Sequence, residues 1–334
     1  MSSLRIFLIG VLALTLGATI AAADPSPDKL LADGRVDEAV ASLRSKIQNA
    51  PTDASSHNLL CRAYLAVGNW DAGISACEKA VTLEPSNSQY HLWLGRIYGE
   101  KADHVAFFSA AGLAKKVRNE FETAVRLDPR NQEARADLAE FYLEAPGIVG
   151  GGKDKAEGQA QELSALDPPQ GNLVRARIAE KNSDWDTAEK EFHTAIQISG
   201  GRAGTWMNLA QYYRRRGRLD DMQDAILHAA SAPKNQHVLM SAAEALIRTK
   251  RDLPLAAELL RRYLASNTVE DAPTFKAHYW LGVVLQEQGD KRGAAQEYRA
   301  ALALARNYAQ AKTALNRLNR EVADGQTPGS NLTD

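Results

Sequence analysis

The sequence has few of the residues from which metal sites and nucleophilic active sites are built. It contains two cysteines and seven histidines in 334 residues. No His-Glu-x-x-His motif and no closely spaced cysteine pair is present. No serine stands in the G-x-S-x-G turn of the α/β-hydrolases. The sequence therefore provides no catalytic or metal-binding constellation, and we expect a non-enzymatic protein without a cofactor.

The sequence also has no excess of charge of one sign. Its formal net charge is -1, whereas proteins that bind nucleic acids carry a concentrated basic excess. The one basic cluster is followed at once by two aspartates: Arg214, Arg215, Arg216, Arg218, Asp220 and Asp221. Such a mixed run is typical of a solvated helix end. We therefore expect no nucleic-acid partner.

Only one long apolar run is present, and it lies at the beginning of the chain. Arg5 precedes apolar residues 6–20, and three alanines, 21–23, follow before Asp24. This layout is typical of a secretory signal peptide cleaved after Ala23. An uncleaved anchor is the alternative, although a spanning helix needs about 20 apolar residues. We expect residues 1–23 to be removed, leaving a periplasmic or secreted protein that is not inserted in a membrane.

The feature that the sequence does carry is a repeat of 34 residues. Phe192, Ile226 and Leu260 are 34 apart, as are Gly34 with Gly68 and Pro51 with Pro85. Four segments share large residues at i, i+3 and i+7: His57, Leu60, Tyr64; His91, Leu94, Tyr98; Trp206, Leu209, Tyr213; and His278, Leu281, Leu285. A helix with this spacing buries one stripe, and Gly95 and Gly282 allow a second helix to approach closely.

These segments resemble the tetratricopeptide-repeat (TPR) family, whose pattern is W-x2-L-G-x2-Y, then A-x3-F, then P. The resemblance implies an all-α TPR solenoid: a right-handed superhelix of about eight helix-turn-helix repeats over residues 24–322. Prolines 51, 85, 129 and 168 are expected to close the first four units. The predicted units span 24–53, 54–87, 88–131, 132–168, 169–202, 203–236, 237–274 and 275–308, followed by a capping helix at 309–322 and a disordered tail at 323–334.

In this family the first helix of each repeat lines a concave face that binds proteins or extended peptides. Mapped onto this sequence, the resemblance implies nine contact residues: Asn58, Arg62, Trp93, Arg96, Met207, Gln211, Arg214, Arg215 and Tyr279. The clamp that some members use on carboxyl termini is not reproduced, because Leu59, Asp137 and Gly204 stand at its polar positions. We expect a scaffold in the cell envelope; the alternative is a subunit of an envelope assembly machine, such as cytochrome maturation or polysaccharide export. The sequence does not predict the oligomeric state.

Three segments depart from the period, and the shortest, residues 266–272 of the seventh unit, is expected to be a longer loop. Residues 99–116 add about ten residues to the third unit, and this apolar insert is expected to pack into the superhelix groove or to contact the ligand directly. Residues 145–152 replace the turn of the fourth unit with a glycine-rich loop. Gly147, Gly152 and Lys153 match the spacing of a phosphate-binding loop, which suggests a nucleotide-using enzyme as a minor alternative. Asp154 argues against it, because a serine or threonine is needed there to bind magnesium.

Cys61 and Cys77 lie on the two helices of the second unit. In an oxidising compartment they could form a disulfide if their Cα atoms lie within about 7 Å, and otherwise they are two small core residues. His57, His91 and His278 occupy the position of the family's tryptophan in their first helices, so packing is a better interpretation for them than metal binding.

Overall fold

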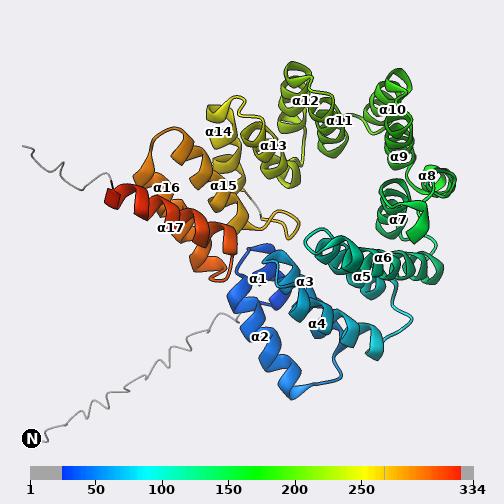
Figure 1. The fold of residues 1–334 in the computed structure, drawn as a ribbon, viewed down its shortest axis with the longest axis horizontal. Coiled ribbons are helices and arrows are strands. Elements are labelled where there is room, and N and C mark those ends of the chain that lie inside the picture. The colour runs from blue at the N-terminus through cyan, green and yellow to red at the C-terminus, as the bar shows by residue number, and fades with distance from the viewer. Residues whose placement is uncertain (1–24, 267, 325–334) are drawn as a thin grey trace, which may run out of the picture.

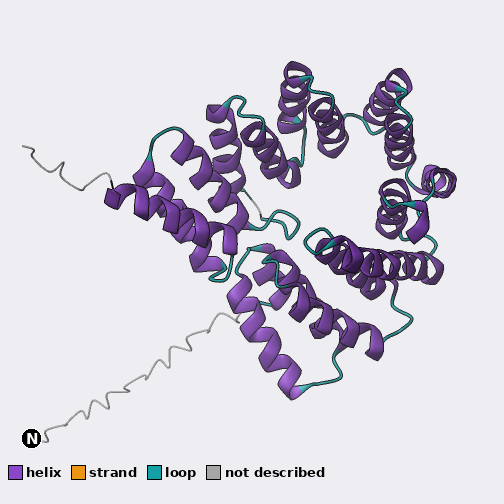
Figure 2. Ribbon diagram, in the orientation of Figure 1, coloured by secondary structure: helices purple, strands orange, loops and turns teal. Residues whose placement is uncertain are grey.

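The structure is a computed structural model that describes residues 25–266 and 268–324. Within these ranges the chain forms seventeen α-helices, one short 3-10 turn and no strand (Figure 2). The first eight helices are α1 (Pro27–Ala32), α2 (Val36–Asn49), α3 (Ala54–Ala66), α4 (Trp70–Leu83), α5 (Ser88–Ala102), α6 (Phe107–Leu127), α7 (Gln132–Glu144) and α8 (Lys153–Leu166), with the turn η1 (Gly147–Val149) before α8. The others are α9 (Pro168–Lys181), α10 (Trp185–Ile198), α11 (Ala203–Arg215), α12 (Leu219–Ser231), α13 (Gln236–Arg248), α14 (Leu253–Leu264), α15 (Thr274–Glu287), α16 (Lys291–Leu304) and α17 (Ala309–Asp324).

The first sixteen helices form eight antiparallel pairs, and α17 packs on α16. The all-α solenoid predicted from the repeat is thus the observed fold. From the second pair to the eighth, each pair begins within one residue of the start of the corresponding predicted unit. Pro168 differs from its predicted role: it is the first residue of α9 rather than the end of the fourth unit. Proline suits that position because its missing N–H has no partner in the first turn of a helix.

Two glycines show how closely the helices of a pair approach each other. A Cβ added to Gly95 on α5 would lie 2.4 Å from the Phe121 ring on α6, and one added to Gly282 would lie 2.6 Å from the Tyr298 ring. Both rings are at least 94% buried. The aromatic ring of the second helix therefore fills the space that the missing side chain leaves on the first.

The eight pairs curve until the first meets the last, so that the solenoid closes into a ring (Figure 1). A single apolar cluster contains Leu30, Leu31 and Val36 from the first pair together with Phe275 and Tyr308 from the end of the chain. The backbone also takes part. Gly34, at φ +70°, leaves no room for a side chain, because a Cβ there would lie 2.7 Å from the Thr274 amide nitrogen.

Polar contacts accompany this closure. Asp37 accepts hydrogen bonds from the backbone N–H of Arg306 at 2.8 Å and from its Nε at 3.1 Å. Thr268 donates to Asp33 at 2.8 Å. An ion pair with an exposed partner contributes about 0–1 kcal/mol, whereas full burial of one large apolar side chain contributes about 1.5–3 kcal/mol. Because Phe275 is fully buried, the apolar contacts dominate the junction.

The insert in the third unit is helical except for residues 103–106. The helix α5 continues to Ala102, and α6 begins at Phe107 and runs for 21 residues. Phe107 is 76% exposed. Packing of this segment into the superhelix groove, the first of the two arrangements expected from the sequence, is therefore wrong for Phe107.

The predicted signal peptide, residues 1–23, lies outside the described residues, as does most of the predicted tail. The helix α17 includes the first two residues of that tail, Ala323 and Asp324. Among the helices that the structure describes, none combines the length and the apolar character needed to cross a bilayer.

Candidate functional site

The inner side of the ring holds a cavity of about 1290 Å³. Its walls come almost entirely from the first helices of the pairs, with one contribution from the loop between α14 and α15. The lining residues are Asp28 on α1; Ser55, Asn58, Leu59 and Arg62 on α3; Asn87, Gln89, Tyr90, Trp93 and Arg96 on or next to α5; Glu133 on α7; Gln170 on α9; His237 on α13; and Glu270 and Asp271 in the loop. The lining is mainly polar and charged, and it contains two aromatic side chains.

Trp93 and two arginines form the centre of one wall of this cavity. The Arg62 guanidinium lies 4.9 Å from the centroid of the Trp93 ring, and that of Arg96 lies 4.7 Å from it. Arginine on an indole face is an attractive cation–π contact. Because the three side chains come from α3 and α5, they join two neighbouring repeats. Four of the nine predicted contact residues, Asn58 and these three, line the cavity.

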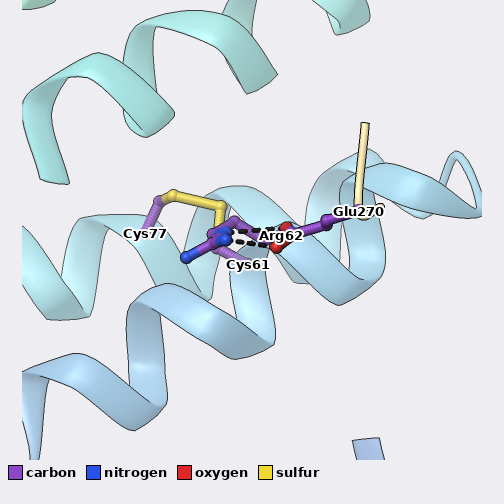
Figure 3. The surroundings of a disulfide bond; sticks show 4 residues. All are labelled: Cys61, Arg62, Cys77 and Glu270. Carbon is purple, nitrogen blue, oxygen red and sulfur yellow. Dashed lines mark hydrogen bonds and ion pairs between the residues drawn. A yellow bond between two sulfur atoms is a disulfide. The ribbon is translucent and has the colours of Figure 1, made fainter. Parts of the chain in front are cut away.

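Arg62 also forms an ion pair with Glu270 across the junction that closes the ring. Its Nε donates to Glu270 at 2.8 Å, its Nη2 donates to the other carboxylate oxygen, and the two residues are 208 positions apart. Both side chains are 23% exposed. The preceding residue, Cys61, points in another direction and forms a disulfide with Cys77 of α4, with their Cα atoms 5.2 Å apart (Figure 3). Successive residues of α3 thus connect this helix to its partner helix α4 and to the loop between α14 and α15.

Arg96 is held by two acids of the next repeat. Its Nε donates to Asp137 at 2.6 Å and its Nη2 donates to Glu133 at 3.0 Å. Burial lowers the pKa of Arg96, but the carboxylates of Asp137 and Glu133 outweigh it and leave the pKa above its ordinary value. The side chain therefore remains a cation fixed beside Trp93.

Asn58 contributes a buried amide to the same wall. The residue is 4% exposed, and its Nδ2 has no hydrogen-bond partner among the described residues. An unsatisfied buried donor costs about 1–3 kcal/mol. Its position on the cavity wall is thus a place where hydrogen-bonding capacity is left unused.

The other five predicted residues do not line the cavity. Met207 is 6% exposed and packs in the core, so its side chain is not displayed on the concave face. Gln211 accepts a hydrogen bond from Arg214 at 2.8 Å. Arg215 donates two hydrogen bonds to the Glu180 carboxylate, at 2.6 and 2.8 Å. Tyr279 packs against other aromatic rings, 6.0 Å from Tyr298 and 5.5 Å from Tyr308.

Sequence reasoning missed several lining residues. Gln89 and Tyr90 precede the tryptophan position of α5, and Gln170 and His237 lie in the first turns of α9 and α13. Glu270 and Asp271 lie in an extension of the seventh unit that looks like an ordinary longer loop. Only the ring closure brings that loop to α3, and no local sequence signal indicates it.

The glycine-rich loop is not arranged for phosphate binding. The backbone N–H groups of residues 149–152 all donate to carbonyls: Val149 and Gly151 to Pro146, Gly150 to Gly147 and Gly152 to Tyr142. The ammonium of Lys153 reaches the end of α9, where it donates to the Lys181 carbonyl at 3.4 Å and to Asn182. A phosphate-binding loop needs free N–H groups and a lysine turned toward them. The nucleotide alternative therefore gains no support.

The histidines at the tryptophan positions make structural hydrogen bonds. His91 lies 2.6 Å from Glu120 and 3.0 Å from the Pro85 carbonyl, and His278 lies 2.6 Å from Glu297. His57 lies 3.1 Å from the Pro51 carbonyl. No group of three or more potential metal ligands occurs among the described residues.

Comparison with known proteins agrees with this architecture. Two segments, residues 30–97 and 248–311, match models described as tetratricopeptide repeat. No curated protein matches the chain.

Among solved structures, yeast Tom70 is 15% identical with a TM-score of 0.52, covering 93% of this chain and 67% of its own. A thermophilic TPR protein of Thermus thermophilus, TTC0263, is 22% identical with a TM-score of 0.44, covering 58% of this chain and 99% of its own. A tetratricopeptide repeat protein from Parabacteroides merdae is 15% identical with a TM-score of 0.43, covering 88% and 98%. At these identities the likeness to Tom70 shows the fold alone.

Proposed function

Because the chain is a tetratricopeptide-repeat solenoid, we propose that it is a non-enzymatic scaffold of the cell envelope that binds proteins or extended peptides in the cavity of its ring. TPR folds typically bind protein partners, and their helical repeats are reused for many of them. The observation that carries the proposal is the cavity of about 1290 Å³ with Trp93 beside Arg62 and Arg96 on its wall. Tryptophan and arginine are the residues most enriched at interface hot spots.

The chemistry of the cavity suits a peptide main chain better than a small apolar molecule. Amide side chains such as Gln89 and Gln170 donate and accept hydrogen bonds, and the aromatic rings of Tyr90 and Trp93 offer apolar surface between them. Extended peptides present both kinds of group along their length.

The proposed location in the periplasm or outside the cell rests on residues 1–23 and on the disulfide. The sequence of these residues has the three parts of a signal peptide. A disulfide between Cys61 and Cys77 persists in oxidising compartments and is rare in the cytosol.

The proposal is tested by partner capture with the mature protein, residues 24–334, from an envelope extract of the source cells. Trp93→Ala should reduce capture of its partners by about tenfold or more, as expected for a central hot spot. The matched control is Trp185→Ala. Trp185 also lies under an arginine, Arg216 at 3.8 Å, but does not line the cavity. Equal capture by wild type and Trp93→Ala would rule out the cavity as the binding site.

A further inference from the structure

Two of the departures from the repeat, in the third and fourth units, meet in space. The insert of the third unit extends α6, and the glycine-rich loop of the fourth unit forms η1, and both line one pocket of about 660 Å³. The wall contains Phe107, Ala110, Ala111 and Ala114 from the insert and Pro146, Ile148 and Val149 from the loop. Neither segment is needed to build a repeat, yet together they make a site that a regular array would not have.

This pocket presents apolar surface to solvent. Phe107 is 76% exposed and Ile148 is 87% exposed, and they are the two most exposed large apolar side chains in the described part of the chain. Phe141 and Phe121 line the same pocket. Its volume falls within the range of about 300–1,000 Å³ typical of ligand pockets. Exposed apolar side chains grouped around a pocket are a mark of an interaction site.

The pocket is separate from the central cavity. Of the residues that line the two spaces, only Arg96 is common to both. The central cavity is mainly polar, whereas the second pocket is mainly apolar. A ligand of the pocket can therefore be distinguished from a ligand of the ring by mutation.

The rim of the pocket is acidic, and part of this charge is not neutralised. Of its five carboxylates, three are paired: Asp137 with Arg96 at 2.6 Å, and Glu140 and Glu144 with Arg177 at 3.1 and 2.9 Å. Glu100 and Asp103, at the end of α5 next to Phe107, form no direct ion pair among the described residues, and only Glu100 interacts at longer range with a cation, Lys276 of α15. Both are exposed.

We propose that this pocket binds a peptide segment that presents a large apolar side chain beside lysine or arginine. The apolar side chain enters between Phe107, Phe141 and Ile148, and the cation lies against Glu100 and Asp103. Complementary charge at a rim increases the association rate and selects against acidic partners. The same acidic rim disfavours an anionic membrane surface, which is the other place where exposed apolar side chains insert.

The test is a selection of random displayed peptides on the mature protein, residues 24–334, followed by fluorescence anisotropy of the recovered peptides. Phe107→Ser with Ile148→Ser removes the apolar contacts, and Glu100→Lys with Asp103→Lys reverses the rim. Two control pairs carry the same chemistry elsewhere. Ile198→Ser with Leu227→Ser changes side chains that are 48% and 44% exposed, and Asp186→Lys with Asp224→Lys reverses exposed acids that do not line the pocket.

Peptides that depend on Phe107 and Ile148 are expected to contain a large apolar residue next to lysine or arginine. Each pocket pair should weaken them about tenfold or more, a loss of about 1.4 kcal/mol. The control pairs and Trp93→Ala should leave their affinity unchanged, and salt should weaken it.

Several results would overturn the proposal. These are the absence of any peptide that depends on the apolar pair, dependent peptides that are acidic or uncharged, and no effect of the rim reversal. Loss of the same peptides with Trp93→Ala would place them in the central cavity. Sedimentation of the wild type, but not of the apolar pair, with vesicles of anionic phospholipid would assign the patch to a membrane.

Discussion

Single residues determine how tightly the helices of each pair pack. Gly95 and Gly282 occupy equivalent positions of the third and eighth units, and each faces an aromatic ring of its partner helix at a distance that excludes a methyl group. The sequence predicted this close approach, because the repeat pattern places glycine on the buried stripe. The partner rings, Phe121 and Tyr298, lie four residues after Val117 and Ala294, at the aromatic position of the A-x3-F pattern of the second helices.

We predict that Gly95→Ala lowers the free energy of unfolding by about 1–3 kcal/mol, the usual cost of overpacking. The added Cβ would lie 2.4 Å from the Phe121 ring, which is 94% buried, so the ring must shift to accommodate it. Gly112→Ala on α6 is the matched control, because no atom lies within 4 Å of its Cβ. That change should stabilise the helix by about 0.5–1 kcal/mol. Urea denaturation of both variants measures the difference, and similar effects would contradict this packing.

Protonation of His91 makes the stability of the third unit depend on pH. Burial lowers its pKa, but the hydrogen bonds to Glu120 and to the Pro85 carbonyl outweigh burial, so the pKa lies above its ordinary value. The protonated ring donates to both partners. A raised histidine pKa adds stability that is fully present below the unfolded pKa, about 6.5, and is lost as pH rises through the folded pKa.

We therefore expect this contribution to stability to disappear as the pH rises from about 6.5 through the folded pKa of His91. Thermal melting across this range should show a smaller pH dependence for both His91→Gln and Glu120→Gln than for wild type. The second variant keeps the histidine and removes only the carboxylate. A dependence unchanged in either variant would show that the pair does not control it.

Helices were predicted well wherever the 34-residue period holds, because the spacing of buried residues fixes both the helix and its partner. The period gives no prediction for the secondary structure of the insert, residues 99–116, because these residues are additional to the repeat. Its own residues favour a helix: Ala110, Ala111, Leu113 and Ala114 are strong helix formers. Local propensity therefore decides the structure of this segment.

The pair α3 and α4 is also joined covalently. The two cysteines are 16 residues apart and close a short loop between the helices. The sequence did not determine whether this disulfide forms, because the spacing of two cysteines does not give the distance between their Cα atoms.

We predict that loss of this disulfide costs about 2–4 kcal/mol, the usual effect of opening a loop of this size. Reductant should lower the melting temperature of the mature protein, and Cys61→Ser with Cys77→Ser should lower it by the same amount and abolish the effect of reductant. Because the chain has only two cysteines, reductant acts on this bond alone. Two free thiols in the unfolded, unreduced protein would contradict the bridge.

At the scale of the whole molecule, the repeat pattern predicted a solenoid but not its closure. Each pair is rotated slightly relative to the last, and small differences in this rotation decide whether eight pairs leave a gap or meet. Such differences arise from side chains at every interface, so no single motif encodes them. Arg62 and Trp93 were predicted on the inner face from their positions in the repeat. Glu270, the partner of Arg62, was not predicted, because its contact with Arg62 depends on the closure.

Closure also determines what the inner face can bind. An open solenoid offers a groove with two free ends, whereas this ring places residues of α3, α5 and the loop before α15 around one cavity. Since the junction is mainly apolar, moderate salt should not open it, although salt screens the exposed pair of Asp37 and Arg306.

The most direct test of the closed ring is a distance between its first and last pairs in solution. Cysteines would be introduced in place of the exposed residues Glu38 and Asn307, which are adjacent to the bonded Asp37 and Arg306, and would then carry the spin labels. The native cysteines, Cys61 and Cys77, are joined in a disulfide and are not labelled. A control pair with labels at Glu38 and Lys190 of α10 spans the ring (Figure 1). The closed ring predicts one short, narrow distance for the first pair and a long one for the control. A broad distribution of long distances between positions 38 and 307 would show that the solenoid is open.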